Sequence, residues 1–214
     1  MDIKELESRA MLCVNEYDGI VPHFGAFYID SIIYSASRCL DSFNRYEVLK
    51  TKDVSAAELI SILQEAVGHS AALSRYFWPS FFFDKKSQKQ PLAKLKEKRA
   101  EKLREAFYLN DNSVLCNRDL RNAWEHFDER LDSYLLENCS GYFFPSCIIG
   151  SHELADDPAG HIFKLLDVEN ECLVLLGKKY FFQLIKKSVE TILAIAMKMN
   201  KNGASLQRIS PDTL

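Results

Sequence analysis

Three side chains in the segment LRNAWEHFDERLD, Arg121, Asn122 and His126, could together act on a phosphodiester. A histidine with an unperturbed pKa of about 6.5 can move protons near neutral pH. An arginine is permanently charged and can donate two parallel hydrogen bonds to phosphate oxygens. Asn122 precedes His126 by four residues, so its amide could orient the imidazole on a helix. These residue types are suited to RNA cleavage by the RNA's own 2'-hydroxyl, which requires no metal ion.

The helix that carries these residues is predicted from about Asn117 to Asn138. Its apolar seam has helical spacing and consists of Leu120, Ala123, Trp124, Phe127, Leu131, Tyr134 and Leu135. On one straight helix, Arg121 and His126 are separated by about 140° and about 7.5 Å along the axis. One such helix cannot readily direct both side chains at one phosphate, whereas two copies crossing about a two-fold axis could. The spacing therefore predicts a homodimer.

The motif RNAWEH, residues 121–126, resembles the R-x(4 to 6)-H motif of the HEPN superfamily of helical proteins, which has a polar residue after the arginine. The context is also similar, because a long helix ending in the aromatic corner Tyr76–Phe83 precedes the motif. The resemblance spans about residues 23–200. It implies a compact helical bundle with the motif on a late helix.

Many HEPN proteins are metal-independent endoribonucleases or toxins that act as dimers. The resemblance therefore implies that Arg121 and His126 are catalytic and that Asn122 supports them. Other members are non-catalytic modules for nucleotide binding or assembly, and this alternative stays open. Under it, Arg121 and Glu125 form an ordinary surface pair four residues apart, and His126 is an exposed histidine near Glu129.

Four further helices are predicted from apolar spacing and from capping residues. The first two cover about residues 2–16 and His23 to Arg45. The third follows the capping residues Asp53 to Ser55 and ends near Pro79, and the fourth begins at Pro91. Between Gly141 and Gly177 the pattern changes to short apolar runs, which predict two or three strands. Helical spacing returns from Lys178 and ends at Gly203.

The resulting fold class is mainly α, an HEPN-like helical bundle with a small β insert before the C-terminal helix. Composition is typical of a globular protein, with 47% hydrophobic and 27% charged residues. The length of 214 residues fits one core. We therefore expect a single domain over residues 1–214, with the strand-rich insert at about 141–177.

A basic strip lies in the segment from Lys85 to Arg104, which holds nine Lys or Arg residues against two Glu, while the whole chain has a net charge of −3. Such a strip can attract a polyanion, although a lysine-rich helix face is more often only solvated. Under the RNA-binding interpretation, the contacting side chains are those that share one helix. They are Lys94, Lys98, Arg99 and Lys102.

Other candidate residues carry weaker signals. His69 lies on an apolar stripe, where a buried, hydrogen-bonded histidine is the ordinary case, but it could support the site if its helix faces Arg121. The segment 151–161 gathers acids and histidines without metal-site spacing, so no metal site is predicted. The six cysteines form no CxxC pair and are expected to be free thiols, with Cys39 and Cys172 buried.

The chain contains no apolar run near the roughly 18 residues that cross a bilayer, and its first residues do not resemble a secretory signal. We therefore expect a cytoplasmic protein with no membrane contact. The expected partners are RNA, a second copy of the chain and, by family resemblance, an antitoxin or regulatory protein in a toxin or defence setting. No cofactor is expected.

Overall fold

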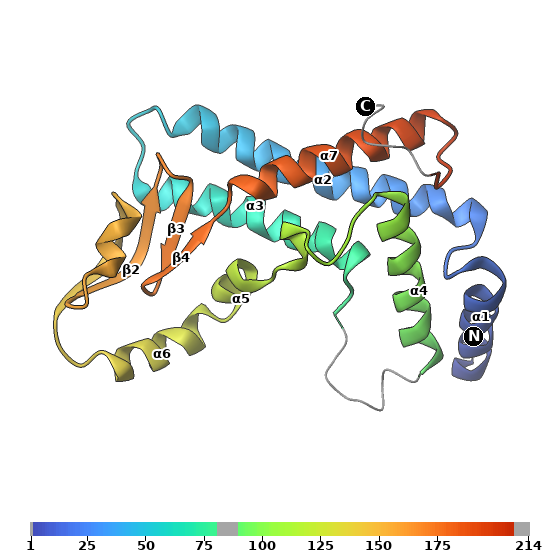
Figure 1. Cartoon of the computed structure of the whole chain (residues 1–214), viewed down its shortest axis with the longest axis horizontal. Helices are drawn as coiled ribbons and strands as arrows, with labels where there is room; N and C mark the ends of the chain where they lie inside the picture. Colours follow the sequence, from blue (N-terminus) through green and yellow to red (C-terminus); the bar gives the residue numbers. More distant parts are fainter. Residues whose placement is uncertain (1, 81–89, 208–214) are drawn as a thin grey trace. The chain divides into compact units, whose positions relative to one another are not determined.

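The computed structural model describes residues 2–80 and 90–207, and this part of the chain forms seven α-helices and one four-stranded sheet (Figure 1). The helices are α1 Ile3–Tyr17, α2 Gly25–Leu49, α3 Ala56–Phe77, α4 Pro91–Ala106, α5 Asp119–Glu125, α6 Phe127–Glu137 and α7 Gln183–Lys201. The strands are β1 Tyr142–Ile149, β2 Gly160–Asp167, β3 Cys172–Leu175 and β4 Lys178–Phe181. The predicted mainly α class is confirmed.

The chain divides into two compact units, which we describe separately. Unit 1 comprises Met1–Ser37, Ser70–Cys116 and Val189–Leu214, and unit 2 comprises Arg38–His69 and Asn117–Ser188. Helices α2, α3 and α7 each contribute residues to both units. The single domain expected over residues 1–214 stays a prediction.

In unit 1, α1 and α4 contact each other (Figure 1). The close approach of the chain to α4 after α1 depends on Gly19. Gly19 follows α1 with a φ of +84°, a conformation that favours glycine. A Cβ atom at this position would lie 2.4 Å from the backbone nitrogen of Arg99 and 2.7 Å from the carbonyl carbon of Lys98. Only a residue without a side chain therefore allows this close approach of the chain to α4.

Two aromatic residues at the C-terminal end of α3 and just after it, Phe77 and Trp78, pack within unit 1. The rings of Phe77 and Phe107 pack edge to face with centroids 5.2 Å apart, and the indole of Trp78 donates a hydrogen bond to Asp111 at 2.9 Å. Both Phe77 and Trp78 are buried. This part of the predicted corner is a packed junction, and Phe81–Phe83 lie outside the described residues.

Helix α3 begins where the capping residues predicted it, because the hydroxyl of Ser55 accepts a hydrogen bond from the backbone N–H of Glu58 at 3.2 Å. Every residue of its predicted apolar stripe is buried. These residues are Leu59, Ile62, Leu63, Ala66, Ser70, Leu73 and Phe77. The helical spacing in this segment therefore identified the core-facing side correctly.

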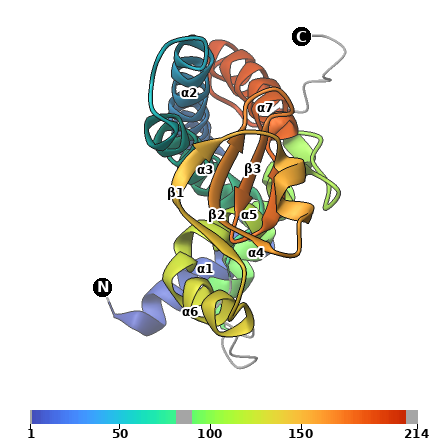
Figure 2. The same cartoon turned by 90° about the vertical axis from the view of Figure 1, so that its left-hand side faces the viewer.

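The sheet of unit 2 has the strand order β1-β2-β3-β4 (Figure 2). Strand β1 runs parallel to β2, whereas β2, β3 and β4 pair in antiparallel fashion. A small apolar cluster of Ile162, Leu165 and Val174 lies at its centre. The strands β1, β2 and β3 lie within the predicted insert.

The prediction that a helix starts at Lys178 was wrong, because residues 178–181 form β4 and α7 begins at Gln183. Strands β3 and β4 form a hairpin in which Leu175 pairs with Lys178. The two residues between them, Leu176 and Gly177, both have positive φ, at 48° and 73°. A two-residue loop with this conformation matches the twist of paired strands, so the chain continues as a strand.

Within residues 2–80 and 90–207, none of the helices has both the length and the apolar character that crossing a bilayer requires.

Candidate functional site

The helix predicted from Asn117 to Asn138 is interrupted at His126, which corrects the straight-helix geometry. Helix α5 ends at Glu125 and α6 begins at Phe127, while His126 itself has a φ of −116° and a ψ of 36°. Because the two motif residues no longer share one continuous helix, the angle of about 140° between them does not apply. The geometric reason for expecting a dimer is lost with it.

The contacts at this break join α5 and α6 to the sheet. The ammonium of Lys164, on β2, lies 5.9 Å from the ring centroid of Trp124 and 4.6 Å from that of Phe127. Such cation–π contacts are favourable by roughly 0.5–2 kcal/mol each, depending on exposure. Residues on both sides of His126 are thus anchored on the same lysine.

Arg121 is mostly buried, with 17% of its side chain exposed, and it forms an ion pair with Glu125 at 2.8 Å. Its Nε atom is buried without a hydrogen-bond acceptor among the described residues, and the same holds for the indole nitrogen of Trp124. Unpaired buried donors are rare in folded proteins. The motif helix therefore holds two buried N–H groups without an acceptor among the described residues.

His126 is more open, since 53% of its side chain is exposed. Its Nδ1 atom lies 3.4 Å from the carboxylate of Glu129, whose own side chain is 74% exposed. An ion pair between such exposed groups contributes little to stability and exchanges readily with solvent. The imidazole is therefore accessible, with a carboxylate neighbour on the helix that follows it.

The two supporting residues form no side-chain hydrogen bond with the motif side chains in the described part of the chain. Asn122 interacts with His126 through the backbone, where its carbonyl accepts a hydrogen bond from the His126 N–H at 3.1 Å. His69 is half-buried on α3. Among the described residues, neither its ring nor the Asn122 amide is hydrogen-bonded to Arg121 or His126. Their supporting roles stay predictions.

Three of the four side chains predicted to bind RNA form contacts inside unit 1. Lys98 forms an ion pair with Glu101 at 2.7 Å, and the hydrogen bond to this carboxylate raises the pKa of Lys98. Arg99 lies over the ring of Tyr28 at 5.6 Å. The ammonium of Lys102 donates to two backbone carbonyls, of Tyr17 at 2.7 Å and of Ile20 at 3.3 Å.

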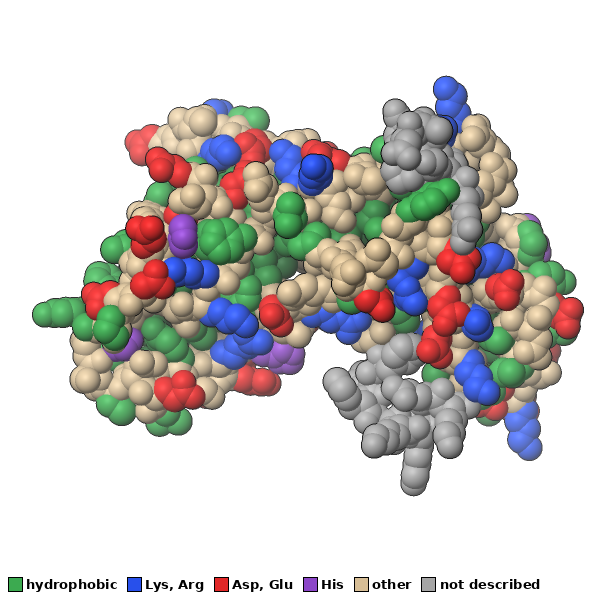
Figure 3. Space-filling view, viewed as in Figure 1, with side chains coloured by type: hydrophobic (Ala, Val, Ile, Leu, Met, Phe, Trp, Pro, Cys, Tyr) green, Lys and Arg blue, Asp and Glu red, His purple; other side chains and the backbone are tan. Residues whose placement is uncertain are grey.

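The fourth side chain, Lys94, is exposed near the start of α4. On the face shown in Figure 3, Lys and Arg side chains are interspersed with Asp and Glu. A surface that binds a nucleic acid backbone usually gathers cations instead. Binding of RNA to α4 stays a prediction, with Lys94 as its most available contact.

The segment 151–161 and its surroundings contain a histidine–aspartate contact that the sequence pattern did not single out. The Nδ1 atom of His152 lies 2.6 Å from Oδ2 of Asp167, which is buried at the end of β2. Burial alone would raise the pKa of Asp167, but hydrogen bonds from His152 and Asn170 outweigh it and hold this pKa well below its usual range. The spacing Asp167-x-x-Asn170 is the local signal for this turn, because the aspartate accepts from the backbone and side chain of Asn170.

Two other polar side chains of this segment have partners of their own and, among the described residues, do not contact the His152–Asp167 pair through hydrogen bonds. The two carboxylate oxygens of Asp156 accept hydrogen bonds from the ammonium of Lys179, at 2.6 and 2.7 Å. The Nε2 atom of the buried His161 forms a hydrogen bond with the carbonyl of Ser140 at 2.6 Å. No group of three or more metal-ligating side chains occurs among the residues that the structure describes. The cysteines, all in the described part, are free thiols. Cys39 and Cys172 are buried as predicted, and burial raises the pKa of Cys172.

Searches of protein-family models, of curated proteins and of solved structures find no match to this chain. The resemblance to the HEPN superfamily therefore depends on the motif residues 121–126 and on their helical context. Function has to be argued from the side chains of this chain.

Proposed function

We propose that this protein is a metal-independent endoribonuclease that uses Arg121 and His126, acting as a cytoplasmic homodimer of the HEPN type. The observation that carries the proposal is the combination of groups around the α5–α6 break. A half-exposed imidazole lies at the break, and five residues earlier a guanidinium retains an N–H group without an acceptor among the described residues. Both groups have the chemistry that phosphodiester cleavage needs.

In the proposed reaction, the 2'-hydroxyl of a ribose attacks the adjacent phosphorus while the bond from phosphorus to the 5'-oxygen breaks. The products are a 2',3'-cyclic phosphate and a 5'-hydroxyl, so no water is consumed in this step. His126 transfers a proton, either from the attacking hydroxyl or to the leaving oxygen. Arg121 stabilises the negative charge on the phosphate oxygens, as a fixed guanidinium can in a partly buried position. The step as written needs no metal or cofactor.

The second copy has a specific role in this proposal. Within one chain, no hydrogen bond or ion pair joins Arg121 to His126 in the part that the structure describes. The proposal therefore requires a two-fold axis that brings the arginine of one chain near the histidine of the other. By the same resemblance, a toxin or defence setting with an antitoxin or regulatory protein as partner is part of the proposal.

A second candidate function is a non-catalytic binding or dimerisation module. The observation that favours it is that both motif side chains have carboxylate partners on their own segment, at 2.8 Å for Arg121 and Glu125 and at 3.4 Å for His126 and Glu129. A substrate phosphate would have to displace Glu125 from the guanidinium. In a module, these pairs only fix the surface of α5 and α6.

The test is RNA cleavage in the presence of a chelator, with single-stranded and structured RNA, and with a DNA of the same sequence. We expect cleavage of RNA alone, with cyclic-phosphate and 5'-hydroxyl ends identified by mass spectrometry. Arg121→Ala and His126→Ala should each lower the rate at least about 100-fold, the loss expected when one charge-stabilising or proton-transferring group is removed. Sedimentation at several concentrations measures whether the active species is a dimer.

Matched controls are available in the same chain. His23 is an exposed histidine in unit 1, and Arg38 forms an exposed pair with Asp41 at 2.6 Å. His23→Ala and Arg38→Ala should cleave like the wild type. If the wild type leaves RNA intact under all conditions, or if all five proteins cleave equally, the ribonuclease proposal fails and the module remains.

A further inference from the structure

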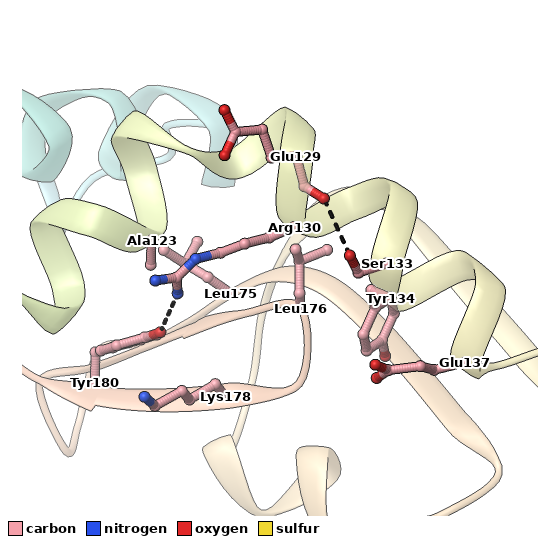
Figure 4. A pocket seen from close by; sticks show the side chains of 10 residues that line it. All are labelled: Ala123, Glu129, Arg130, Ser133, Tyr134, Glu137, Leu175, Leu176, Lys178 and Tyr180. Atoms are coloured by element: carbon pink, nitrogen blue, oxygen red, sulfur yellow. Dashed lines mark hydrogen bonds between the residues drawn. The ribbon is translucent and has the colours of Figure 1, made fainter.

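A pocket of about 390 Å³ lies in unit 2 between α6 and the β3–β4 hairpin (Figure 4). Its size falls within the range of pockets that hold small molecules. Side chains from several segments line it. They come from α5, α6 and the β3–β4 hairpin, and include Arg130, Tyr134, Glu137, Lys178 and Tyr180.

One end of the pocket carries positive charge. The guanidinium of Arg130 donates to the hydroxyl of Tyr180 at 3.3 Å and has no carboxylate partner among the described residues. A guanidinium has five N–H donors, so most of those of Arg130 are available to a ligand. The ammonium of Lys178 lies 5.4 Å from the ring centroid of the same tyrosine and only loosely contacts Asp119, at 3.7 Å. Two cations therefore flank Tyr180.

The other end of the pocket is acidic and aromatic. Figure 4 shows Glu137 and Tyr134 close together, away from Arg130, Lys178 and Tyr180. The carboxylate of Glu137 has no hydrogen bond or ion pair within the described part of the chain. Glu137 is exposed, so water solvates its carboxylate, and a ligand donor group such as an amine would replace that water. Leu175 and Leu176 line the pocket as apolar residues.

We propose that this pocket binds a phosphate monoester carried on a ring that also bears an amino group, the chemistry of an amino-bearing nucleoside monophosphate. Arg130 would hold the phosphate through parallel hydrogen bonds, with Lys178 as a second cation. The apolar residues and the Tyr134 ring contact the ring of the ligand, and Glu137 accepts a hydrogen bond from its amino group. Free phosphate would leave most of the 390 Å³ unfilled.

This site does not depend on the proposed ribonuclease activity. In Figure 4 the carboxylate of Glu129, the partner of His126, is directed away from Arg130 and Tyr180. His126 is not one of the residues that line the pocket, although its partner Glu129 is. A variant that loses ligand binding should still cleave RNA, and a variant at His126 should still bind the ligand.

Calorimetry with the full chain tests the proposal, with AMP, GMP, CMP, UMP, adenosine and inorganic phosphate as separate probes. We expect AMP, GMP or CMP to bind at least about tenfold more tightly than adenosine, which lacks the phosphate, and than inorganic phosphate, which lacks the ring. UMP has no amino group and should bind more weakly than CMP. Equal binding of inorganic phosphate and the nucleotides would overturn the proposal, as would no binding at millimolar concentration.

Variants then locate the site. Arg130→Gln should lower the affinity for the preferred nucleotide at least about tenfold. Lys178→Gln, at a side chain 59% exposed and therefore safe for folding, should lower it severalfold. Glu137→Gln should reduce the preference for CMP over UMP. The matched control is Arg45→Gln, because Arg45 is an exposed arginine of unit 2 paired with Glu65 at 2.9 Å. Unchanged affinity in Arg130→Gln and Lys178→Gln would show that the nucleotide binds elsewhere, and the assignment would fail.

Discussion

Two cations on α4 of unit 1 have a different kind of partner from two charged pairs of unit 2. On α4 of unit 1, Lys102 donates to backbone carbonyls at the end of α1, and Arg104 donates to the carbonyl of Phe77. In unit 2, Arg121 is paired with Glu125, and His152 with Asp167. Carbonyls do not titrate, whereas carboxylates and imidazoles do. The contact of Asp167 with His152 therefore responds to pH through the Asp167 carboxylate, whereas the contacts of Lys102 and Arg104 hold helix ends.

The comparison also shows why a count of charges does not locate a binding surface. The basic strip of α4 is the most charged segment of the sequence, yet most of its predicted RNA contacts form bonds within unit 1. The α5–α6 segment has fewer cations, but Arg121 and Arg130 retain donors without acceptors among the described residues. Availability depends on tertiary partners, which charge patterning does not reveal.

The largest expected effect tests whether the carbonyl contacts of unit 1 require the close approach at Gly19. Gly19→Ala should lower the free energy of unfolding by about 3 kcal/mol or more, because a Cβ would overlap the backbone of α4 in a backbone conformation that disfavours alanine. Gly68→Ala is the matched control, since Gly68 lies in α3 and a Cβ added there would meet no atom within 4 Å. It should be neutral or stabilise by up to about 1 kcal/mol in urea denaturation. Equal losses in both variants would contradict the prediction.

The second prediction concerns how the free energy of unfolding depends on pH through Asp167 in unit 2. The pKa of Asp167 is lower in the folded than in the unfolded protein, so the ionised carboxylate contributes to the free energy of unfolding. This contribution is complete above the unfolded pKa of about 3.9 and is lost as the pH falls through the folded-state pKa. Asp167→Asn should therefore lower the free energy of unfolding by about 2 kcal/mol at pH 7, and the difference from wild type should shrink below about pH 4. Denaturation curves of both proteins at about pH 7, 5 and 3 measure it. A difference that stays constant over this range would show that the charge is not involved.

The smallest effect concerns two lysines on α4. Lys102→Met keeps the aliphatic stem and removes two hydrogen bonds to carbonyls, so it should cost about 1 kcal/mol, independent of pH between about 5 and 8. Lys98→Gln removes an exposed pair with Glu101 and should leave the unfolding curve unchanged. Chemical denaturation of both variants at two pH values checks the pair. If Lys98→Gln costs as much as Lys102→Met, the distinction between the two kinds of contact is wrong.

Much of the fold follows from local sequence. The Ser55 cap and the stripe on α3 were predicted correctly because a long, amphipathic segment carries its own periodic signal. Strand β4 was missed, since four residues are too short to show a period and the hairpin depends on positive φ at Leu176 and Gly177. A leucine in that conformation is not expected from its type.

The candidate site was less predictable. The residue types of Arg121 and His126 identified the chemistry, but residues 117–138 contain neither glycine nor proline, so nothing local indicated the break at His126. The pocket at Arg130 combines α6 with a hairpin about 40 residues later in the chain. The contact of His152 with Asp167 likewise lies where two parallel strands end. Such sites arise from tertiary pairing, which spacing along the chain does not specify.

The two outer strands of the sheet bear on how the protein avoids aggregation. An outer strand exposes unpaired N–H and C=O groups to which another chain can add. In β1, Pro145 lacks the N–H, and the register with β2 shifts between Phe144 and Cys147. Strand β4 has only four residues, of which Lys178 and Lys179 are charged. Both borders of the sheet thus discourage strand addition, even though Phe143 and Phe144 beside Pro145 are exposed.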